Sequence, residues 1–235
     1  MKFVNRSNEI GHMKESVKLS QLKLFSLSIS GLRRVGKTRL ILEILTDKDI
    51  YFFVNKNKES RSLLKEYETI LKEKKIVTEL ESLKDWDEFF NIIFKRFKGI
   101  IVFDEFQNFI NVDNSVFGIL QKYIDLNENK KGLLFVFSGS TVGLIRKLFS
   151  DAKEPLYGRL KRKIHLQQLS FKNCIELCEQ LKIKDIEEII KLYCIFGGYP
   201  KYYISIEDEN LFGKSTSEIL DRFFFQKNAI LEEEI

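Results

Sequence analysis

The sequence is poor in the residues that break or staple a chain. Its 235 residues include 2 Pro and 3 Cys, which excludes a collagen-like chain, a proline-rich linker and a disulfide scaffold. No apolar run approaches the roughly 20 residues that a membrane span requires, and the first residues are too polar for a signal peptide. We therefore expect a cytoplasmic protein with no membrane partner.

An excess of one charge is also lacking. Lys and Arg number 39 against 34 Asp and Glu, which gives a formal net charge of +5, and the two signs are interspersed. Such a balance permits a nucleic-acid partner without requiring one. With 44% hydrophobic residues, a chain of this length can bury a core without a metal or disulfide. Length alone predicts one or two domains.

Segments typical of strands alternate with segments typical of helices over the first two thirds of the chain. Short apolar runs predict strands at residues 22–30, 50–55, 99–103, 132–137 and 163–166. Helical periodicity predicts helices at residues 37–46, 59–74, 85–98, 112–126 and 142–149. This alternation indicates an α/β fold of three layers, in which helices cover both faces of a parallel sheet.

The pattern changes near residue 167. Helical periodicity continues at residues 170–181, 186–196 and 217–229, with no strand predicted between them. Gly197-Gly198 is predicted to end the second of these helices, and Pro200 to prevent its continuation. We therefore predict two domains, an α/β core over residues 1–167 and a small all-α domain over residues 168–235.

The most specific motif is GLRRVGKT at residues 31–38, which matches G-x-x-x-x-G-K-[ST] between a predicted strand and a predicted helix. Its glycines let backbone N–H groups approach phosphate oxygens, and the helix N-terminus adds positive charge. Lys37 is predicted to reach the β- and γ-phosphates, and the Thr38 hydroxyl to hold Mg²⁺. The alternative is an ordinary glycine-bearing turn. The expected nucleotide-binding residues are Gly31, Leu32, Arg33, Arg34, Val35, Gly36, Lys37, Thr38 and Arg39.

Two adjacent carboxylates follow the predicted strand at residues 99–103. Ligands of parallel sheets lie beyond the carboxyl ends of strands, so Asp104 is predicted to position Mg²⁺. Glu105 is predicted to orient and polarise an attacking water. The neighbouring strand is followed by Ser138 and Ser140, either of which could sense the γ-phosphate, and Ser140 is favoured because it lies further past the strand. Caps for the following helices are the alternative for all four residues.

Together these motifs resemble those of the archaeal ATPase family, P-loop NTPases of the signal-transducing STAND group that are related to AAA+ ATPases. The resemblance covers nearly the whole chain and implies that the all-α domain is a lid. Leu32 departs from it, because the family commonly has proline there. The shared segments are F-x-x-R-x-x-E-I at 3–10, the P-loop arginines, D-E-F-Q at 104–107, S-G-S at 138–140, P-L-Y-G-R at 155–159 and G-G-Y-P-K-Y at 197–202.

The resemblance also implies roles for residues outside the P-loop. Phe3 and Arg6 lie where the family contacts the adenine end of the nucleotide. Arg159 resembles an arginine that approaches the γ-phosphate, within one chain or between subunits, and Pro200 resembles a lid contact to the nucleotide. The alternatives are a surface arginine paired with a phosphate or carboxylate, and a plain helix stop. Family members usually continue into a winged-helix domain, whereas this chain ends at Ile235. We therefore expect a natural short form or a fragment, and DNA binding by such later domains does not transfer.

The sequence thus predicts an ATP-binding, Mg²⁺-dependent ATPase that acts as a nucleotide-driven switch, with ATP, ADP and Mg²⁺ as its ligands. One alternative is a nucleotide-gated module that binds DNA or a protein, suggested by the basic residues at 153–163. Another is a P-loop kinase, which Glu105 disfavours because a water-activating glutamate is typical of hydrolases. A homo-oligomer stays open, as does a DNA or protein partner bound through the C-terminal region.

Overall fold

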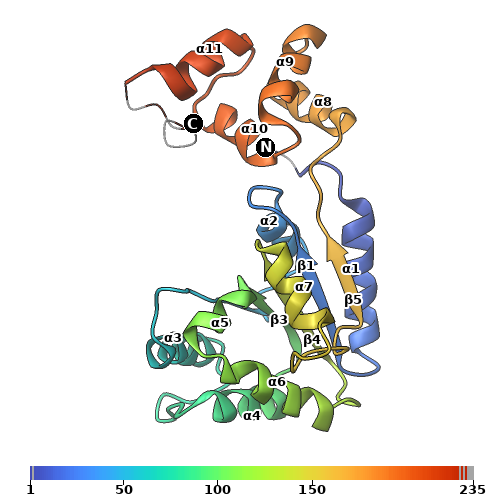
Figure 1. Cartoon of the computed structure of the whole chain (residues 1–235), viewed down its shortest axis with the longest axis vertical. Coiled ribbons are helices and arrows are strands. Elements are labelled where there is room, and N and C mark those ends of the chain that lie inside the picture. Colours follow the sequence, from blue (N-terminus) through green and yellow to red (C-terminus); the bar gives the residue numbers. More distant parts are fainter. Residues whose placement is uncertain (2, 228, 230, 232–235) are drawn as a thin grey trace. The chain divides into compact units, whose positions relative to one another are not determined.

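The computed structural model describes residues 1, 3–227, 229 and 231 of the chain (Figure 1). These residues divide into two compact units. The sheet unit comprises residues 7–32 and 37–166, and the helical unit comprises the described residues of 1–6, 33–36 and 167–235. The predicted core domain had included residues 1–6 and 33–36. They belong to the helical unit because Val4 packs in its core and Arg6 bonds to the carbonyls of Val35 and Gln167.

The described residues of the sheet unit form five parallel strands in the order β2-β3-β4-β1-β5. The strands β1, β3 and β4 are buried along almost their whole length, as expected where helices flank a sheet. This arrangement confirms the predicted α/β fold with a parallel sheet. The bounds are β1 Phe25–Ser30, β2 Ile50–Phe53, β3 Gly99–Asp104, β4 Leu133–Gly139 and β5 Arg162–His165.

The register of the sheet aligns the ends of its strands. Asp104 pairs with Phe53 of β2, and its neighbour Phe103 pairs with Phe137 of β4. Because all strands are parallel, their last residues share one edge of the sheet and their first residues share the other. We call these the carboxyl edge, marked by Ser30, Phe53, Asp104 and Gly139, and the amino edge, marked by Phe25, Ile50, Gly99 and Leu133.

Helices connect the strands. The helix over residues 7–20 was not predicted, because the side chains that it buries are Met13, Ser16 and Ser20 rather than an apolar stripe. The helix that follows the P-loop ends at Leu42 instead of residue 46. The bounds are α1 Ser7–Ser20, α2 Lys37–Leu42, α3 Ser60–Glu73, α4 Trp86–Arg96, η1 Phe106–Asn108, α5 Phe109–Val112, α6 Ser115–Leu126 and α7 Val142–Ser150.

Aromatic side chains dominate the core of the sheet unit. The rings of Phe52 and Tyr67 stack with centroids 4.2 Å apart, and Phe103 lies 5.4 Å from Phe52. Trp86 begins α4, where its indole N–H donates to Ser60 Oγ over 2.9 Å. Aromatic ring pairs such as Phe52 with Tyr67 stabilise a fold by about 0.5–1.5 kcal/mol beyond the effect of burying their surface area. The carboxyl edge therefore rests on a rigid, closely packed base.

The regular elements described after residue 167 are all helices, joined by short loops. The helix over Ile186–Phe196 ends with Gly197 as its C-cap, as predicted, and Pro200 does not continue it but begins the next helix, α10, where its missing N–H costs nothing in the first turn. The helix predicted at residues 217–229 is instead a short α-helix followed by a π-helical turn that ends at Phe225, and residue 228 lies outside the described residues. The bounds are α8 Phe171–Gln180, α9 Ile186–Phe196, α10 Pro200–Asp208, α11 Thr216–Leu220 and η2 Asp221–Phe225.

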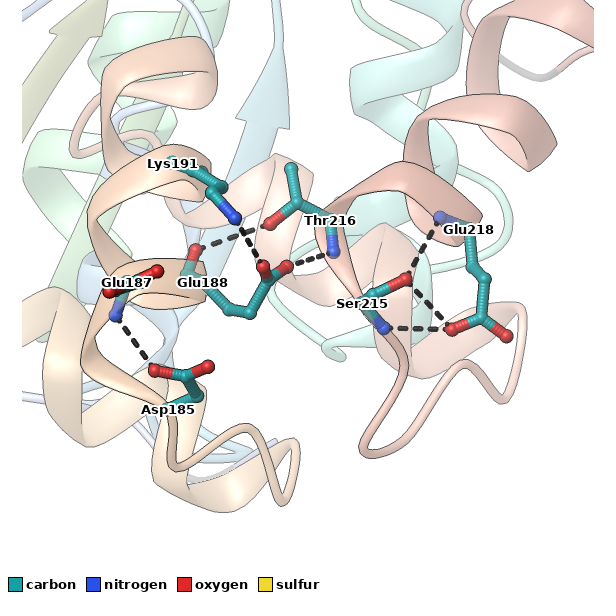
Figure 2. Close-up of polar contacts among 7 residues, drawn as sticks. All are labelled: Asp185, Glu187, Glu188, Lys191, Ser215, Thr216 and Glu218. Atoms are coloured by element: carbon teal, nitrogen blue, oxygen red, sulfur yellow. Dashed lines mark hydrogen bonds and ion pairs between the residues drawn. The ribbon is translucent and has the colours of Figure 1, made fainter.

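Polar caps join α9 to α11 within the helical unit (Figure 2). The Glu188 carboxylate accepts Lys191 Nζ over 2.6 Å and the Thr216 backbone N–H, while Thr216 Oγ1 donates to the Glu188 carbonyl. Ser215 and Glu218 form a reciprocal capping box at the start of α11. The bonds that Glu188 accepts from Lys191, which has the largest effect, and from Thr216 lower the pKa of the Glu188 carboxyl to about 2. None of the described helices is long and apolar enough to cross a membrane.

Candidate functional site

The P-loop motif joins the end of β1, at the carboxyl edge of the sheet, to the start of α2. Lys37 is the first residue of α2, and its side chain is largely buried, with 7% of the residue exposed. Its Nζ donates to the carbonyl oxygens of Gly31, at 2.7 Å, and Leu32, at 2.9 Å. Gly36 has a φ of +95°, which favours glycine, and no heavy atom lies within 4 Å of where a Cβ would stand. The two carbonyl bonds therefore hold the Lys37 ammonium inside the P-loop.

Asp104 ends β3 directly beside the start of α2. Its Oδ2 accepts the Thr38 hydroxyl over 3.3 Å and the Tyr51 hydroxyl, and its Oδ1 accepts the Glu105 backbone N–H over 3.0 Å. The structure thus brings together the two residues predicted to hold Mg²⁺. Hydroxyl and carboxylate oxygens are suitable ligands for this ion, which usually takes only one or two carboxylates and completes its shell with water and phosphate. The donor set therefore fits Mg²⁺.

Tyr51 is a member of this site that the sequence analysis missed. It lies on β2, and burial, followed by its bond to the Asp104 carboxylate, raises the pKa of its hydroxyl well above the usual value. The hydroxyl therefore stays protonated and donates to Asp104 at any physiological pH. Only the register between β2 and β3 brings the two residues together, so the sequence held no local signal for the pair.

Glu105 turns the chain sharply out of β3. Its φ of 53° and ψ of 41° are left-handed values that a residue other than glycine seldom adopts. Its Oε2 accepts the Ser140 hydroxyl over 2.8 Å, the Ser140 backbone N–H over 3.3 Å and the Gln107 amide over 2.5 Å. The favoured serine, Ser140, thus contacts the predicted catalytic carboxylate. The geometry fixes one carboxylate oxygen and leaves the other without a hydrogen bond among the described residues.

Two buried polar atoms beside this carboxylate have no hydrogen-bond partner among the described residues, Ser138 Oγ and Gln107 Oε1. Ser138, which is fully buried on β4, therefore forms no side-chain hydrogen bond to Glu105 among the described residues, unlike Ser140. Gly139 separates the two serines, and a Cβ there would lie 2.2 Å from Gln107 Oε1 and 2.5 Å from Ile145 Cγ1. Only glycine leaves room for Gln107. The glutamine of the D-E-F-Q segment was the available signal for this second missed residue.

Arg159 lies at the other edge of the sheet. Its carbonyl accepts the Ser26 hydroxyl, and Ser26 is the second residue of β1, roughly 13 Å of strand before Ser30. Its guanidinium forms a bidentate pair with Asp125, with N–O distances of 3.0 and 2.9 Å. This placement contradicts a role at the γ-phosphate within its own chain, because the motif returns to the start of β1. A role between subunits stays a prediction.

Several predicted nucleotide contacts lie in the helical unit. Arg6 is buried and donates to the carbonyls of Gln167, at 2.6 Å, and Val35, at 3.3 Å. Arg34 Nη1 donates to the Tyr202 hydroxyl over 2.8 Å, and its guanidinium lies 5.4 Å from the centre of that ring. Phe3 is half-buried. P-loop residues 33–36 are thus attached to the N-terminal segment and to α10.

The remaining predicted contacts have mainly local roles. Arg39 on α2 pairs with Glu43, which follows the end of that helix, over 3.1 Å, while Leu32 and Arg33 are exposed. Pro200 is the first residue of α10. The preceding Gly198 is needed for packing, because its carbonyl accepts the Leu169 N–H over 2.8 Å and a Cβ would lie 1.9 Å from the Leu169 oxygen. The roles of these residues toward a nucleotide stay predictions.

Solved structures share this fold. The Walker-type ATPase of Pyrococcus abyssi aligns with a TM-score of 0.68 at 20% identity, covering 93% of this chain and 72% of that chain. The ORC2 protein of Aeropyrum pernix, solved in ADPNP–ADP complexes, aligns with a TM-score of 0.60 at 14% identity, covering 93% of this chain and 67% of that chain. At these identities the likeness shows the P-loop ATPase fold.

Sequence comparison identifies the family. A curated, uncharacterised protein of Methanocaldococcus jannaschii is 26% identical over 201 residues, which are 85% of this chain. The chain spans 43% of the length of that relative. A family described as the ATPase domain predominantly from Archaea matches residues 3–206. This match spans most of the chain and confirms the predicted resemblance. The chain therefore belongs to the archaeal ATPase domain family.

Proposed function

We propose that the chain binds ATP with Mg²⁺ at the carboxyl edge of its sheet and hydrolyses it to ADP and phosphate. The observation that carries this proposal is the cluster of Lys37, Thr38, Asp104, Glu105 and Ser140 where β1, β3 and β4 end. Membership of an ATPase family supports it. Each of these side chains is oriented by its neighbours, as a site for reaction requires.

Lys37 and Thr38 are the proposed contacts to the phosphates and the metal. Lys37 Nζ already lies against two loop carbonyls, so it can exchange a carbonyl for a phosphate oxygen with a small movement of its flexible side chain. Thr38 and Asp104 would hold Mg²⁺, which supplies charge that neutralises the phosphates and orients them. Tyr51 keeps the Asp104 carboxylate turned toward Thr38.

Glu105 is the proposed water-orienting residue. Ser140 and Gln107 hold its Oε2, which leaves Oε1 to accept a hydrogen bond from water. As the water oxygen bonds to the γ-phosphorus, the bond between that phosphorus and the bridging oxygen breaks, ADP departs and Glu105 receives a proton from the water. Positioning of this kind contributes typically about 10²–10⁴-fold in rate.

The switch is the second part of the proposal. Residues 33–36 of the P-loop pack in the helical unit, through Arg34 with Tyr202 and Val35 with Arg6. Phosphates in this loop would engage the same backbone and so bias the conformation of the helical unit, and hydrolysis would remove that bias. The helical unit is thus the proposed lid, with Pro200 at the start of its α10.

The alternative of a DNA- or protein-binding module is suggested by the basic residues at 153–163. Most of these cations have partners in the structure: Arg159 pairs with Asp125, Lys161 with Glu128 and Arg162 with Glu15. Paired cations release few counterions on binding a polyanion, so this segment is a weak candidate for such a surface. The structure favours the nucleotide site over this alternative.

The test of the proposed function compares ATP binding and phosphate release by the wild type and Lys37→Ala. Lys14→Ala is the matched control, since Lys14 is an exposed lysine on α1. We expect the wild type and the control to bind ATP and release phosphate, and Lys37→Ala to lose both. Absence of ATP binding by the wild type, or equal activity of Lys37→Ala and Lys14→Ala, would refute the proposal.

A further inference from the structure

A hollow of about 540 Å³ lies at the amino edge of the sheet, on the opposite side of the strands from the P-loop. Four segments meet there: the loop before β2, the end of α3, the end of α4 and the residues leading into β3. Its lining is dominated by cations. The lining residues are Asp47, Lys48, Glu73, Lys74, Lys75, Ile76, Lys95, Arg96, Phe97 and Lys98.

Four of these lysines have no hydrogen bond or ion pair to a side chain in the part of the chain that the structure describes. They are Lys48, Lys75, Lys95 and Lys98, and all four are exposed. Lys98 also lies against the loop before β4, where its side chain approaches Gly132. Burial and the nearby Lys98 lower the pKa of Lys130 in that loop. The lining also holds two carboxylates, Asp47 and Glu73, but neither forms an ion pair with these lysines among the described residues, so cations outnumber carboxylates at this edge.

Helix ends account for only part of this charge. α3 and α4 both end at the hollow, and cations in a last turn are favoured by the helix dipole. Arg96 meets this need, since it bonds to the Ile76 carbonyl and pairs with Glu81. Lys74 does so at the end of α3 and donates to the Asp47 carbonyl over 2.6 Å. The four unpaired lysines are in excess of what the helices require.

One of the lysines occupies an unfavourable backbone position. Lys75 follows the C-cap of α3 with a φ of 58°, where glycine or asparagine is usual.

The basic residues at 153–163 provide a comparison with the hollow, because Arg159, Lys161 and Arg162 are all paired with carboxylates. The two basic regions therefore differ in kind. Charge at the hollow remains available to a ligand, whereas charge at 153–163 is largely neutralised.

We propose that this hollow, which we call the basic hollow, binds the phosphate backbone of a nucleic acid. Its cations are mainly lysines, which act as point charges without a fixed hydrogen-bond geometry and suit contact independent of base sequence. An acidic protein partner would also need apolar anchors beside the charges, but Phe97 is buried and Ile76 is half-buried. The basic hollow lies away from the carboxyl edge, so nucleic acid and nucleotide can bind at the same time.

The experiment measures the anisotropy of a labelled duplex DNA of mixed sequence, about two helical turns long, titrated with the full chain. The variant is Lys48→Gln/Lys75→Gln/Lys98→Gln, in which no substitution lies inside a helix. The control is Lys14→Gln/Lys65→Gln/Lys84→Gln, which removes the same charge from exposed lysines of the sheet unit outside the hollow.

We expect the wild type and the control to bind, with affinity that falls steeply between about 50 and 200 mM salt. Each lost phosphate contact lowers the slope of log K against log salt by about 0.9, so the hollow variant should have a slope shallower by about 2 to 3. Its affinity at low salt should fall about tenfold or more, equally for unrelated DNA sequences.

Three results would overturn this proposal: no duplex binding by the wild type at low salt, equal slopes for the hollow variant and the control, or binding of polyglutamate as tight as that of the duplex. The last result would indicate a surface for acidic proteins. Thermal unfolding of all three proteins is compared first, so that lost binding is not mistaken for lost folding. The outcome is independent of ATP hydrolysis, which is measured separately.

Discussion

The carboxyl edge of the sheet and the basic hollow at its amino edge differ in how their charged side chains are held. At the carboxyl edge, the oxygens of Asp104 and Glu105 are held by Thr38, Tyr51 and Ser140 at defined distances. At the amino edge, the lysines of the basic hollow have no carboxylate partner among the described residues. The difference fits the two roles that we propose. Reaction needs oriented groups, whereas contact with a phosphate backbone needs charge without fixed geometry.

The largest expected effect is that of Glu105→Gln, which tests the orientation at the carboxyl edge. The amide keeps the size of the side chain but cannot accept a proton from water. We expect the rate of phosphate release to fall by about 10²–10⁴, while ATP binding is retained. Single-turnover phosphate release and equilibrium ATP binding measure the two effects. An unchanged rate would show that Glu105 does not orient the water.

Packing behind the same edge gives the next effect. Gly139→Ala would place a Cβ 2.2 Å from Gln107 Oε1 and 2.5 Å from Ile145, and overpacking of this kind costs about 1–3 kcal/mol. Gly143→Ala is the control, because no heavy atom lies within 4 Å of its added Cβ and the residue lies in α7. We expect the control to be neutral or stabilising. Equal unfolding free energies for the two variants would contradict the packing at Gly139.

At the amino edge, Arg159→Ala tests whether the pair with Asp125 is structural. The pair is partly exposed, so we expect a loss of at most about 1 kcal/mol of stability. Phosphate release by the monomer should not change, because Arg159 lies away from the P-loop. Ultracentrifugation identifies the concentrations at which the chain is monomeric. A loss of activity in the monomer would contradict the placement, and a loss confined to an assembled form would support a role between subunits.

The smallest expected effect lies in the helical unit. There the Glu188 carboxylate accepts hydrogen bonds from Lys191 and Thr216, as the carboxylates of the carboxyl edge do from their neighbours. Its pKa of about 2 is below the ordinary 4.5, so its contribution to stability is present above pH 4.5 and is lost as the pH falls toward 2. We expect Glu188→Gln to unfold with a weaker pH dependence in this window than the wild type. Glu187→Gln, one residue earlier on α9, is the control. Identical acid unfolding curves for both variants would refute this account.

The contrast between the edges also explains how far the sequence could predict this molecule. Asp104 and Glu105 were predictable because they follow an apolar strand, and strand ends of a parallel sheet meet at one edge. Tyr51 was not, since its contact with Asp104 depends on strand register. Gln107 had a signal in the D-E-F-Q segment, but its contact with Glu105 depends on side-chain packing. The position of Arg159 was not predictable, because its motif carries no mark of which edge of the sheet the chain returns to.

The helices show a similar division. α1 escaped prediction because its buried face includes Ser16 and Ser20, whereas α4 combines an apolar stripe with the N-cap Asp85 and was predicted. The end of α9 at Gly197-Gly198 was also predicted, and Pro200 fits the first turn of the next helix. Local patterns thus identify elements whose burial is apolar and helix ends marked by glycine or proline, and they fail where the buried face is polar.

The most direct test of the central claim is the affinity for ATP with and without Mg²⁺, measured for the wild type and Asp104→Asn. If the carboxyl edge is a nucleotide site with its metal held by Thr38 and Asp104, Mg²⁺ should tighten ATP binding to the wild type. Asp104→Asn should bind ATP without the metal as the wild type does, and should lose most of the tightening. Failure of the wild type to bind ATP in the presence of Mg²⁺, or an undiminished effect of Mg²⁺ on Asp104→Asn, would contradict the account.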